Sequence, residues 1–245
     1  MMKRFIALFI VLLNVLCITA AAQTPIVLMY HRLSDKVASD AYTITPETFE
    51  NDVKYLISKG YTFCTASEFD VAVKSKNTKG LVAITFDDGY ESDYVYALPV
   101  LEKYNVSATF FVIGSKTDTP EYMTKAQLTA LSNSKNVEIG NHFYKLHDTN
   151  YNILKTMYKK NVFSIKTDYD KNQKFLKEVL GKEVKATSYP YGLYGRYFDS
   201  ILKKSGIITF CSEEQAFYNT MVPYGRYTRT ADTTIENIIE RAGNK

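Results

Sequence analysis

The strongest chemical signal in the sequence is a pair of adjacent carboxylates at the end of an apolar run. Asp87 and Asp88 directly follow residues 81–86, and Gly89 then lets the chain turn. An Asp-Gly pair is also common in plain acidic turns, so the pair alone leaves both interpretations open. Its position favours chemistry, because parallel α/β folds build their sites at the carboxyl ends of central strands.

Histidine is scarce, and each of the three histidines follows an apolar run. His31 comes after residues 26–30, and His142 and His147 come after residues 137–141. A single histidine at such a place is more often a structural or surface residue. All three lie beside expected strand ends, and this favours a shared site.

His142 and His147 can reach one ion only if the chain turns between them. Residues five apart lie about 140° apart on an ideal helix and on opposite faces of a strand. Residues 143–147 leave room for a turn. With Asp88, the two imidazoles would then give a divalent metal three protein ligands and leave positions open for water and substrate. Such an arrangement suits hydrolysis.

The elements that must position these residues alternate between strands and helices. Apolar runs predict strands at 25–30, 61–64, 81–86, 107–113, 137–139, 185–189 and 207–211. Threonines with capping patterns predict helix starts at Thr45, Thr65, Thr124 and Thr233. Residues 150–180 are expected to be mostly helical. The alternation predicts a single parallel α/β domain, and the spacing alone leaves a barrel and a doubly wound sheet open.

The amino terminus has the pattern of a secretory signal peptide. Two basic residues precede an apolar run, and alanines 20–22 offer a cleavage site. We expect residues 1–22 to be removed and residues 23–245 to form the catalytic domain of a protein that is secreted or held in the cell envelope. An uncleaved membrane anchor is the alternative.

The charge balance excludes two classes of partner. Removing Lys3 and Arg4 with the leader lowers the formal charge from +4 to +2. Neither nucleic acid nor a membrane surface is therefore expected as a partner, and a monomer is expected. Cys64 and Cys211 remain, as a disulfide or as two buried thiols.

Three motifs in order resemble the polysaccharide deacetylases of carbohydrate esterase family 4, with the NodB-type domain. Residues 85–89 (TFDDG) resemble the first motif, Asn141 to His147 the second, and residues 189–192 (YPYG) the third. The resemblance covers essentially the mature chain and implies a distorted (β/α)7 barrel. It also implies roles: Asp87 as general base, Asp88, His142 and His147 as metal ligands, and Pro190, Tyr191 and Gly192 at the substrate.

The amino-terminal segment 29–32 (MYHR) resembles that of a permuted branch, which includes deacetylases of poly-N-acetylglucosamine biofilm systems. Many family members carry a catalytic histidine near the carboxyl end, but none follows His147 here. The resemblance therefore implies that His31 donates a proton to the leaving amine. The five-residue histidine spacing also fits this branch.

The sequence departs from the family pattern at three places. Phe143 stands where Ser or Thr usually follows the first metal histidine, Ser188 stands where the third motif often has arginine, and tryptophan is absent. These departures concern the orientation of Asp87 and the positioning of substrate more than metal binding. Arg226 and Arg229 are the candidates to orient Asp87 instead. Tyr191, Tyr194 and Tyr197 are candidates for an aromatic cleft wall.

The resemblance predicts a hydrolase that removes N-acetyl groups from an N-acetylglucosamine-containing polysaccharide of the cell wall or extracellular space. The expected cofactor is a divalent ion, zinc above all, and the Tyr191 amide is expected to stabilise the oxyanion. Three alternatives stay open: a non-catalytic envelope protein that binds carbohydrate, an O-acetyl xylan esterase and a peptidoglycan amidase. A serine hydrolase is excluded, because the sequence has no Gly-x-Ser-x-Gly elbow.

Overall fold

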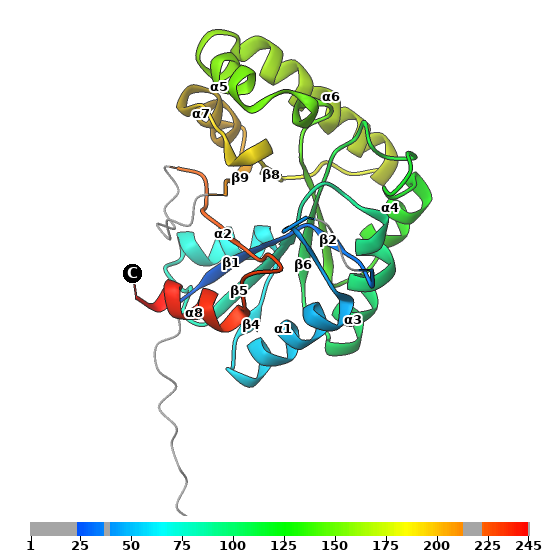
Figure 1. The fold of residues 1–245 in the computed structure, drawn as a ribbon. Coiled ribbons are helices and arrows are strands. Elements are labelled where there is room, and N and C mark those ends of the chain that lie inside the picture. The colour runs from blue at the N-terminus through cyan, green and yellow to red at the C-terminus, as the bar shows by residue number, and fades with distance from the viewer. Residues whose placement is uncertain (1–23, 37–39, 213–221, 245) are drawn as a thin grey trace, which may run out of the picture.

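A curled sheet of eight strands forms the centre of the computed structural model, which describes residues 24–36, 40–212 and 222–244 (Figure 1). The predicted leader, residues 1–22, lies outside the described residues. All strand pairs are parallel, in the order β10-β1-β5-β6-β7-β8-β9, with β4 beside β5. The strands are β1 (Ile26–Tyr30), β4 (Thr62–Phe63), β5 (Leu81–Phe86), β6 (Ala108–Val112), β7 (Val137–Asn141), β8 (Ala186–Ser188), β9 (Ile208–Phe210) and β10 (Tyr227–Thr228). A separate two-stranded sheet pairs β2 (Arg32–Leu33) with β3 (Thr43–Ile44).

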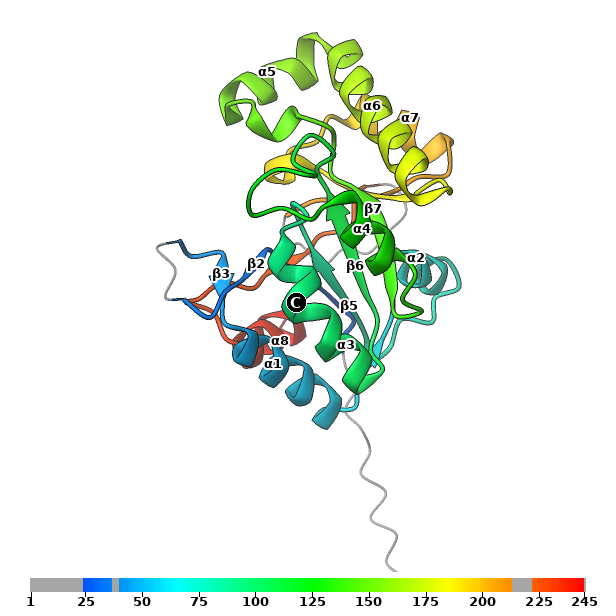
Figure 2. The ribbon, with the colours of Figure 1, turned by 90° about the vertical axis from the view of Figure 1, so that its right-hand side faces the viewer.

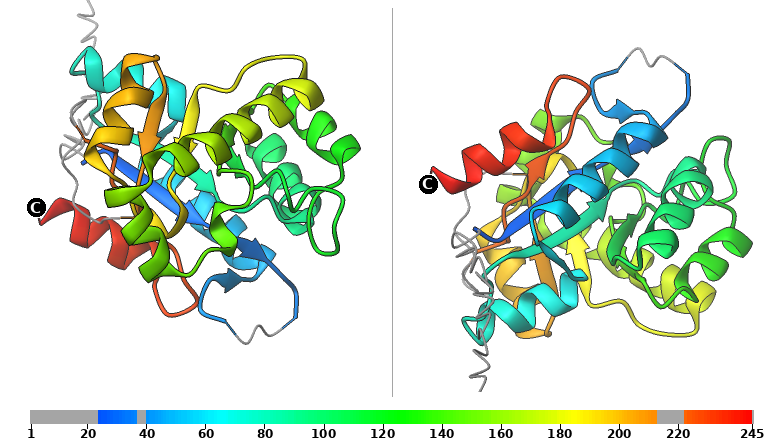
Figure 3. Two further views of the ribbon diagram at one scale, coloured as in Figure 1. Left: turned by 90° about the horizontal axis from the view of Figure 1, so that it is seen from above. Right: turned by 90° about the horizontal axis from the view of Figure 1, so that it is seen from below.

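Helices lie around the outside of the strands, as the views from above and below show (Figure 3). Helices α5, α6 and α7 lie together at one end of the molecule (Figures 1 and 2). The helices are α1 (Pro46–Ser58), α2 (Ala66–Lys74), α3 (Leu98–Tyr104), α4 (Lys125–Ser132), α5 (Tyr151–Lys160), α6 (Val162–Leu180), α7 (Arg196–Lys204) and α8 (Ile235–Gly243). Three short turns of other helix types are η1 (Asp93–Ala97), η2 (Leu146–Asp148) and η3 (Pro190–Gly192).

One segment near the carboxyl end, residues 224–228, connects the two edges of the sheet. Tyr224 pairs with Phe210 of β9, and its carbonyl accepts a hydrogen bond of 2.9 Å from the Cys211 amide. Three residues later, Tyr227 and Thr228 pair with β1. The strands therefore form a distorted barrel, and the predicted parallel α/β barrel is confirmed.

The apolar runs that predicted the central strands are buried on both faces. Every residue of β1 and β6 is buried, as is nearly all of β5. Parallel strands covered by helices on the outside and by core side chains on the inside give this pattern. The rings of Phe86 and Phe110 stack at 4.8 Å between neighbouring strands. The core thus holds the carboxyl ends of these strands in fixed register.

Threonine caps determine where the helices start, and one of the predicted caps is wrong. Thr65 and Thr124 form the predicted capping boxes with Glu68 and Gln127. The last helix is capped by Thr234 rather than by Thr233. The Thr233 hydroxyl accepts a hydrogen bond from the Thr230 amide instead, which places it in the preceding turn.

Cys64 and Cys211 are buried thiols that are not joined in a disulfide, which decides between the alternatives left open by the sequence. Burial raises the pKa of the Cys64 thiol to about 12, so it stays protonated and inert at neutral pH. Within the described ranges, no helix combines the length and the apolar character needed to cross a membrane.

Candidate active site

A cavity of about 580 Å³ lies at the carboxyl ends of the central strands and brings the predicted site residues together. It is lined by side chains that come directly after β5, after β7 and after β1, which supports the expectation that parallel strand ends share one rim. Pro190 is buried and does not line the cavity. The predicted residues that do line it are His31, Asp87, Asp88, His142, His147, Tyr191 and Gly192.

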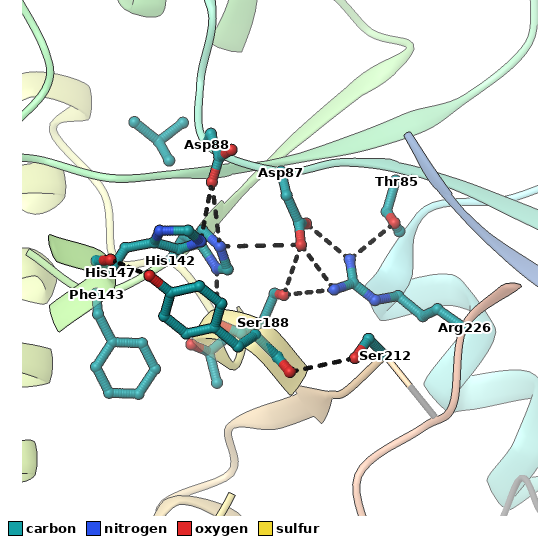
Figure 4. Close-up of polar contacts among 12 residues, drawn as sticks. Thr85, Asp87, Asp88, His142, Phe143, His147, Ser188, Ser212 and Arg226 are labelled. Atoms are coloured by element: carbon teal, nitrogen blue, oxygen red, sulfur yellow. Dashed lines mark hydrogen bonds and ion pairs between the residues drawn. The ribbon is translucent and has the colours of Figure 1, made fainter. Parts of the chain in front are cut away.

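Asp88, His142 and His147 form a cluster that could hold a metal ion. Asp88 Oδ1 lies 3.4 Å from His142 Nε2 and 3.7 Å from His147 Nε2 (Figure 4). Ligand atoms about 2.0–2.1 Å from a tetrahedral ion lie about 3.4 Å apart, so the spacing fits. Asp88 Oδ1 is buried and accepts no hydrogen bond from any described residue. Such an unsatisfied buried oxygen facing two imidazoles fits a divalent cation.

The chain turns between His142 and His147, as their spacing requires. His142 directly follows β7, and its amide donates to the Val112 carbonyl at 3.0 Å. Its ring Nδ1 lies 2.8 Å from the Ser188 carbonyl oxygen. This contact places the proton on Nδ1 and leaves the Nε2 lone pair facing Asp88. Phe143 then takes a left-handed conformation with φ of 65°, and η2 brings His147 back toward the site.

Asp87 is bound by a buried guanidinium next to the cluster of Asp88, His142 and His147. Arg226 donates from both terminal nitrogens to the two carboxylate oxygens of Asp87, each at 2.7 Å (Figure 4). The same side chain donates to Thr85 Oγ1 at 3.0 Å, Ser188 Oγ at 2.6 Å and the Cys211 carbonyl at 3.1 Å. These five bonds match its five donors, so its position is fully determined.

Arg226 also determines the charge state of Asp87. Burial alone would raise the pKa of this carboxyl, but the Arg226 guanidinium outweighs burial and holds the pKa well below its usual range. Asp87 is therefore an oriented, ionised carboxylate at the edge of the cluster of candidate metal ligands. Arg229, the other candidate to orient it, pairs with Asp52 at 2.7 Å. Because Arg226 lies 139 residues from Asp87, sequence spacing alone could not choose between the two arginines.

His31 lines the same cavity, beside the paired carboxylates. Burial lowers the pKa of its imidazole, although the charges of Asp87 and Asp88 act in the opposite direction. Its Nδ1 is buried and makes no hydrogen bond to a described residue. The ring packs against Tyr42 at 4.9 Å. His31 is therefore positioned by packing and is available for proton transfer.

The third motif places backbone close to the site. Tyr191 has a left-handed conformation with φ of 55°, which is uncommon for a non-glycine residue. Gly192 follows with φ of 68°, and a Cβ there would lie 1.9 Å from Ser212 Oγ. Only glycine fits at this close approach. The Tyr191 hydroxyl donates to the His147 carbonyl oxygen at 2.7 Å, so the motif also supports the histidine loop.

Aromatic side chains line the cavity, but not the full predicted set. Tyr191 is there, 43% exposed, whereas Tyr194 and Tyr197 do not line the cavity. Two other half-exposed tyrosines, which the sequence analysis did not single out, line the cavity. Tyr42 lies near His31, and Tyr151 contacts Tyr191 edge to face at 6.2 Å. They lie in a loop and at the start of α5, where no periodic pattern marks an aromatic as functional.

We expect Arg226→Met to destabilise the protein by about 3–5 kcal/mol, because it leaves the buried Asp87 carboxylate without its partner. The matched control is Arg32→Met, since Arg32 also lies 2.7 Å from a carboxylate, that of Glu121, but at an exposed site. That change should cost about 0–1 kcal/mol. Urea unfolding of both variants measures the difference. Equal costs would contradict a strongly coupled Asp87–Arg226 pair.

Comparison with known proteins agrees with this geometry. A sequence profile described as polysaccharide deacetylase matches residues 74–210, more than half of the chain. The chain belongs to the polysaccharide deacetylase family. The poly-beta-1,6-N-acetyl-D-glucosamine N-deacetylase of Staphylococcus aureus (strain MSSA476) is 30% identical over 208 residues, which cover 82% of this chain and 72% of that protein.

Solved structures of polysaccharide deacetylases and related proteins have the same fold. IcaB from Ammonifex degensii superposes with a TM-score of 0.74 at 25% identity, covering 90% of this chain and 97% of that one. The Streptococcus pyogenes deacetylase PplD, in complex with acetate, has a TM-score of 0.72 at 20% identity, covering 90% and 98%. Family membership confirms the resemblance drawn from the three motifs.

Two departures from the family pattern have a structural explanation. Ser188, where the family's polysaccharide deacetylases often have arginine, donates from Oγ to Asp87 Oδ2 at 3.1 Å and accepts from Arg226. The guanidinium is thus supplied from the segment before β10. Phe143 is fully buried among Tyr169, Tyr189 and Phe198, so an aromatic core occupies the place of a small hydroxyl side chain.

Proposed function

We propose that the chain is a metal-dependent N-deacetylase that releases acetate from poly-β-1,6-N-acetyl-D-glucosamine. The observation that carries the proposal is the single cavity in which Asp87, held by Arg226, lies beside the cluster of Asp88, His142 and His147. The substrate follows from the similarity to the Staphylococcus aureus enzyme of that name. Family membership supports hydrolysis of an acetyl group.

Asp88, His142 and His147 would hold the ion, and we propose zinc. Two imidazoles and one carboxylate are ligands that zinc commonly takes, and three protein ligands leave part of its coordination shell open. A divalent ion in such a site polarises an amide carbonyl and lowers the pKa of bound water from about 16 to roughly 7.

Three groups of the chain would act on the substrate: a base, a donor to the oxyanion and an acid. Asp87 is ionised and oriented, so it can accept a proton from the attacking water. The Tyr191 amide, presented by the left-handed turn of the third motif, is proposed to donate to the developing oxyanion. His31 is proposed to deliver a proton to the leaving amine. Because burial lowers its pKa, His31 is neutral at neutral pH. It would first take up a proton from solvent and then deliver it to the amine, and Asp87 would return to solvent the proton that it removed from water, so the transfers balance.

We expect His31→Ala to slow cleavage of an acetylated amino sugar far more than cleavage of an activated acetyl ester. An amine is a poor leaving group unless protonated, whereas an activated alkoxide or phenolate leaves readily. General acid catalysis contributes about 10²–10⁴-fold, and this sets the expected loss on the amide. Zinc content should stay at the wild-type level. A small and equal effect on both substrates would make His31 a structural residue.

Acetate release from defined oligosaccharides tests the proposal as a whole. The substrates are β-1,6-linked and β-1,4-linked oligomers of N-acetylglucosamine and an O-acetylated xylan oligomer, each assayed with chelator and with added zinc. The proposal expects zinc-dependent release that is fastest from the β-1,6 oligomer and leaves free amino groups. Release from xylan alone would indicate an O-acetyl esterase. Binding without release from any substrate would indicate a carbohydrate-binding protein.

The proposed location is outside the cytoplasm, secreted or in the cell envelope. It is supported by the leader pattern in residues 1–22 and by the polymeric nature of the proposed substrate. Amino-terminal sequencing of the exported protein tests the expected cleavage before Gln23.

A further inference from the structure

One carboxylate in the middle of α6 binds the backbone of the loop that carries His147. Asp168 accepts hydrogen bonds from three successive amides: from Tyr144 at 2.8 Å, from Lys145 at 3.0 Å and from Leu146 at 3.3 Å. Oδ1 accepts from Tyr144 and Leu146, and the Lys145 amide donates to Oδ2 and also, at 3.3 Å, to Oδ1. A carboxylate that satisfies three adjacent amides fixes the curvature of the loop that contains them.

The loop needs such a constraint because of its length and its conformation. The two proposed metal-binding histidines lie five positions apart in the sequence, so no regular element sets their relative position. Phe143, at the start of the loop, has φ of 65°, a conformation that a bulky residue adopts only when its surroundings impose it. The three amides bonded by Asp168 cover the whole stretch from Phe143 to His147.

The two histidines differ in how they are held. His142 is 2% exposed and directly follows β7, with hydrogen bonds to Val112 and Ser188. The His147 side chain is 28% exposed, and its direct supports are the ring of Tyr191 at 4.5 Å and the Tyr191 hydroxyl on its carbonyl oxygen. The position of His147 therefore depends on the loop.

Other polar side chains on α6 act elsewhere. Asn172, one turn further along, bonds the Val112 carbonyl, Asn141 Oδ1 and the Gly114 amide, so it ties together the ends of β6 and β7. Within the part of the chain that the structure describes, all side-chain hydrogen bonds of Asp168 go to the loop. This separation makes the contribution of Asp168 testable by itself.

We propose that Asp168 is a positioning residue that preorganises the metal site by fixing His147 relative to Asp88 and His142. The inference rests on the proposed function insofar as that function assigns a metal to these three ligands. Asp168 touches neither the ligand atoms nor the cavity, and it acts through the backbone of Tyr144, Lys145 and Leu146. Its expected effect is on metal affinity, because residues that orient metal ligands typically contribute 10–100-fold to it.

The experiment measures zinc affinity of four full-length mature variants by competition with a chromogenic chelator. Asp168→Ala removes all three hydrogen bonds, and Asp168→Asn keeps the shape but turns a donor toward one loop amide. Both should bind zinc more weakly, Asp168→Ala by about 10–100-fold. Asp168→Glu keeps the charge but displaces the carboxylate, so it should also bind more weakly. Asp170→Asn is the matched control and should bind like wild type.

Asp170 is a suitable control because it lies two residues away on the same helix. It is exposed and pairs with Lys166, and it makes no hydrogen bond to the loop. Its replacement removes the same formal charge from the same helix. A loss of affinity in Asp168→Asn alone therefore reports the hydrogen bonds to the loop.

A second readout separates positioning from general stability. Hydrogen exchange of the metal-free protein should become faster at residues 144–147 in Asp168→Ala, while exchange in β5 and β7 stays unchanged. Faster exchange throughout would assign Asp168 a global structural role and overturn the proposal. Wild-type zinc affinity in Asp168→Ala and in Asp168→Asn would overturn it as well.

Failure of this inference is distinguishable from failure of the proposed function. If wild type binds zinc and releases acetate while the Asp168 variants bind zinc equally well, only the positioning role is wrong. If wild type itself binds no divalent ion, the ligand assignment of the proposed function is wrong, and the role of Asp168 in metal binding falls with it.

Discussion

Replacing Asp87 with Asn is expected to lower the rate of acetate release by about 10²–10⁴-fold while the zinc content stays near that of wild type. An amide cannot accept the proton of the attacking water, so the base is lost. The metal cluster remains, because its carboxylate is Asp88, which lies between both imidazoles. Asp87 Oδ2 is 3.9 Å from His142 Nε2, and both of its oxygens are already bonded to Arg226.

The neighbouring Asp88→Asn is the matched comparison for this prediction. It changes the same chemical group one residue away, but it should remove both zinc and activity, since Asp88 is the proposed ligand. Single-turnover rates and elemental analysis of both variants give the answer. A parallel loss of zinc and activity in Asp87→Asn would make Asp87 a ligand rather than the base.

We expect His142→Ala to weaken zinc binding by more than about 100-fold. Loss of a residue that only hydrogen-bonds to a metal ligand typically weakens metal affinity by about 10–100-fold, and loss of a ligand itself should cost more. The substitution removes one of three protein ligands, and among the described residues the remaining histidine, His31, lines the cavity without belonging to the cluster. Activity at low zinc should fall with occupancy. Equilibrium dialysis against buffered zinc measures the change.

His31→Ala is the control for this experiment. It removes an imidazole from the same cavity, and its zinc affinity should match that of wild type. Circular dichroism of both metal-free variants checks that the fold persists, since the His142 side chain is buried. Undiminished zinc binding in His142→Ala would exclude the proposed ligand set.

The features that the sequence predicted are those that local patterns determine. Fully buried parallel strands give uninterrupted apolar runs, and residues 81–86 therefore predicted β5 and the position of Asp87 and Asp88 at its end. The rule that parallel strand ends share one edge predicted that His31 would join them. Both expectations rest on a few neighbouring residues and on one general property of parallel sheets.

The features that the sequence did not settle depend on long-range packing. Arg226 precedes a strand of only two residues, and whether it or Arg229 meets Asp87 depends on the register of that strand beside β1. Asp168 lies within a helix rich in charged residues, where a carboxylate is usually a solvated surface group. Its three amide partners lie 22–24 residues earlier and show no pattern that points to it.

The segment 224–228 that joins β9 to β1 has a consequence for biosynthesis. Every proposed metal ligand and both proposed catalytic residues are synthesised before Arg226, the group that orients Asp87. Docking of Tyr227 against Leu28 joins residues almost 200 positions apart, and contacts of such separation form slowly. Catalytic competence would then arise as the last step of maturation, together with closure of the barrel.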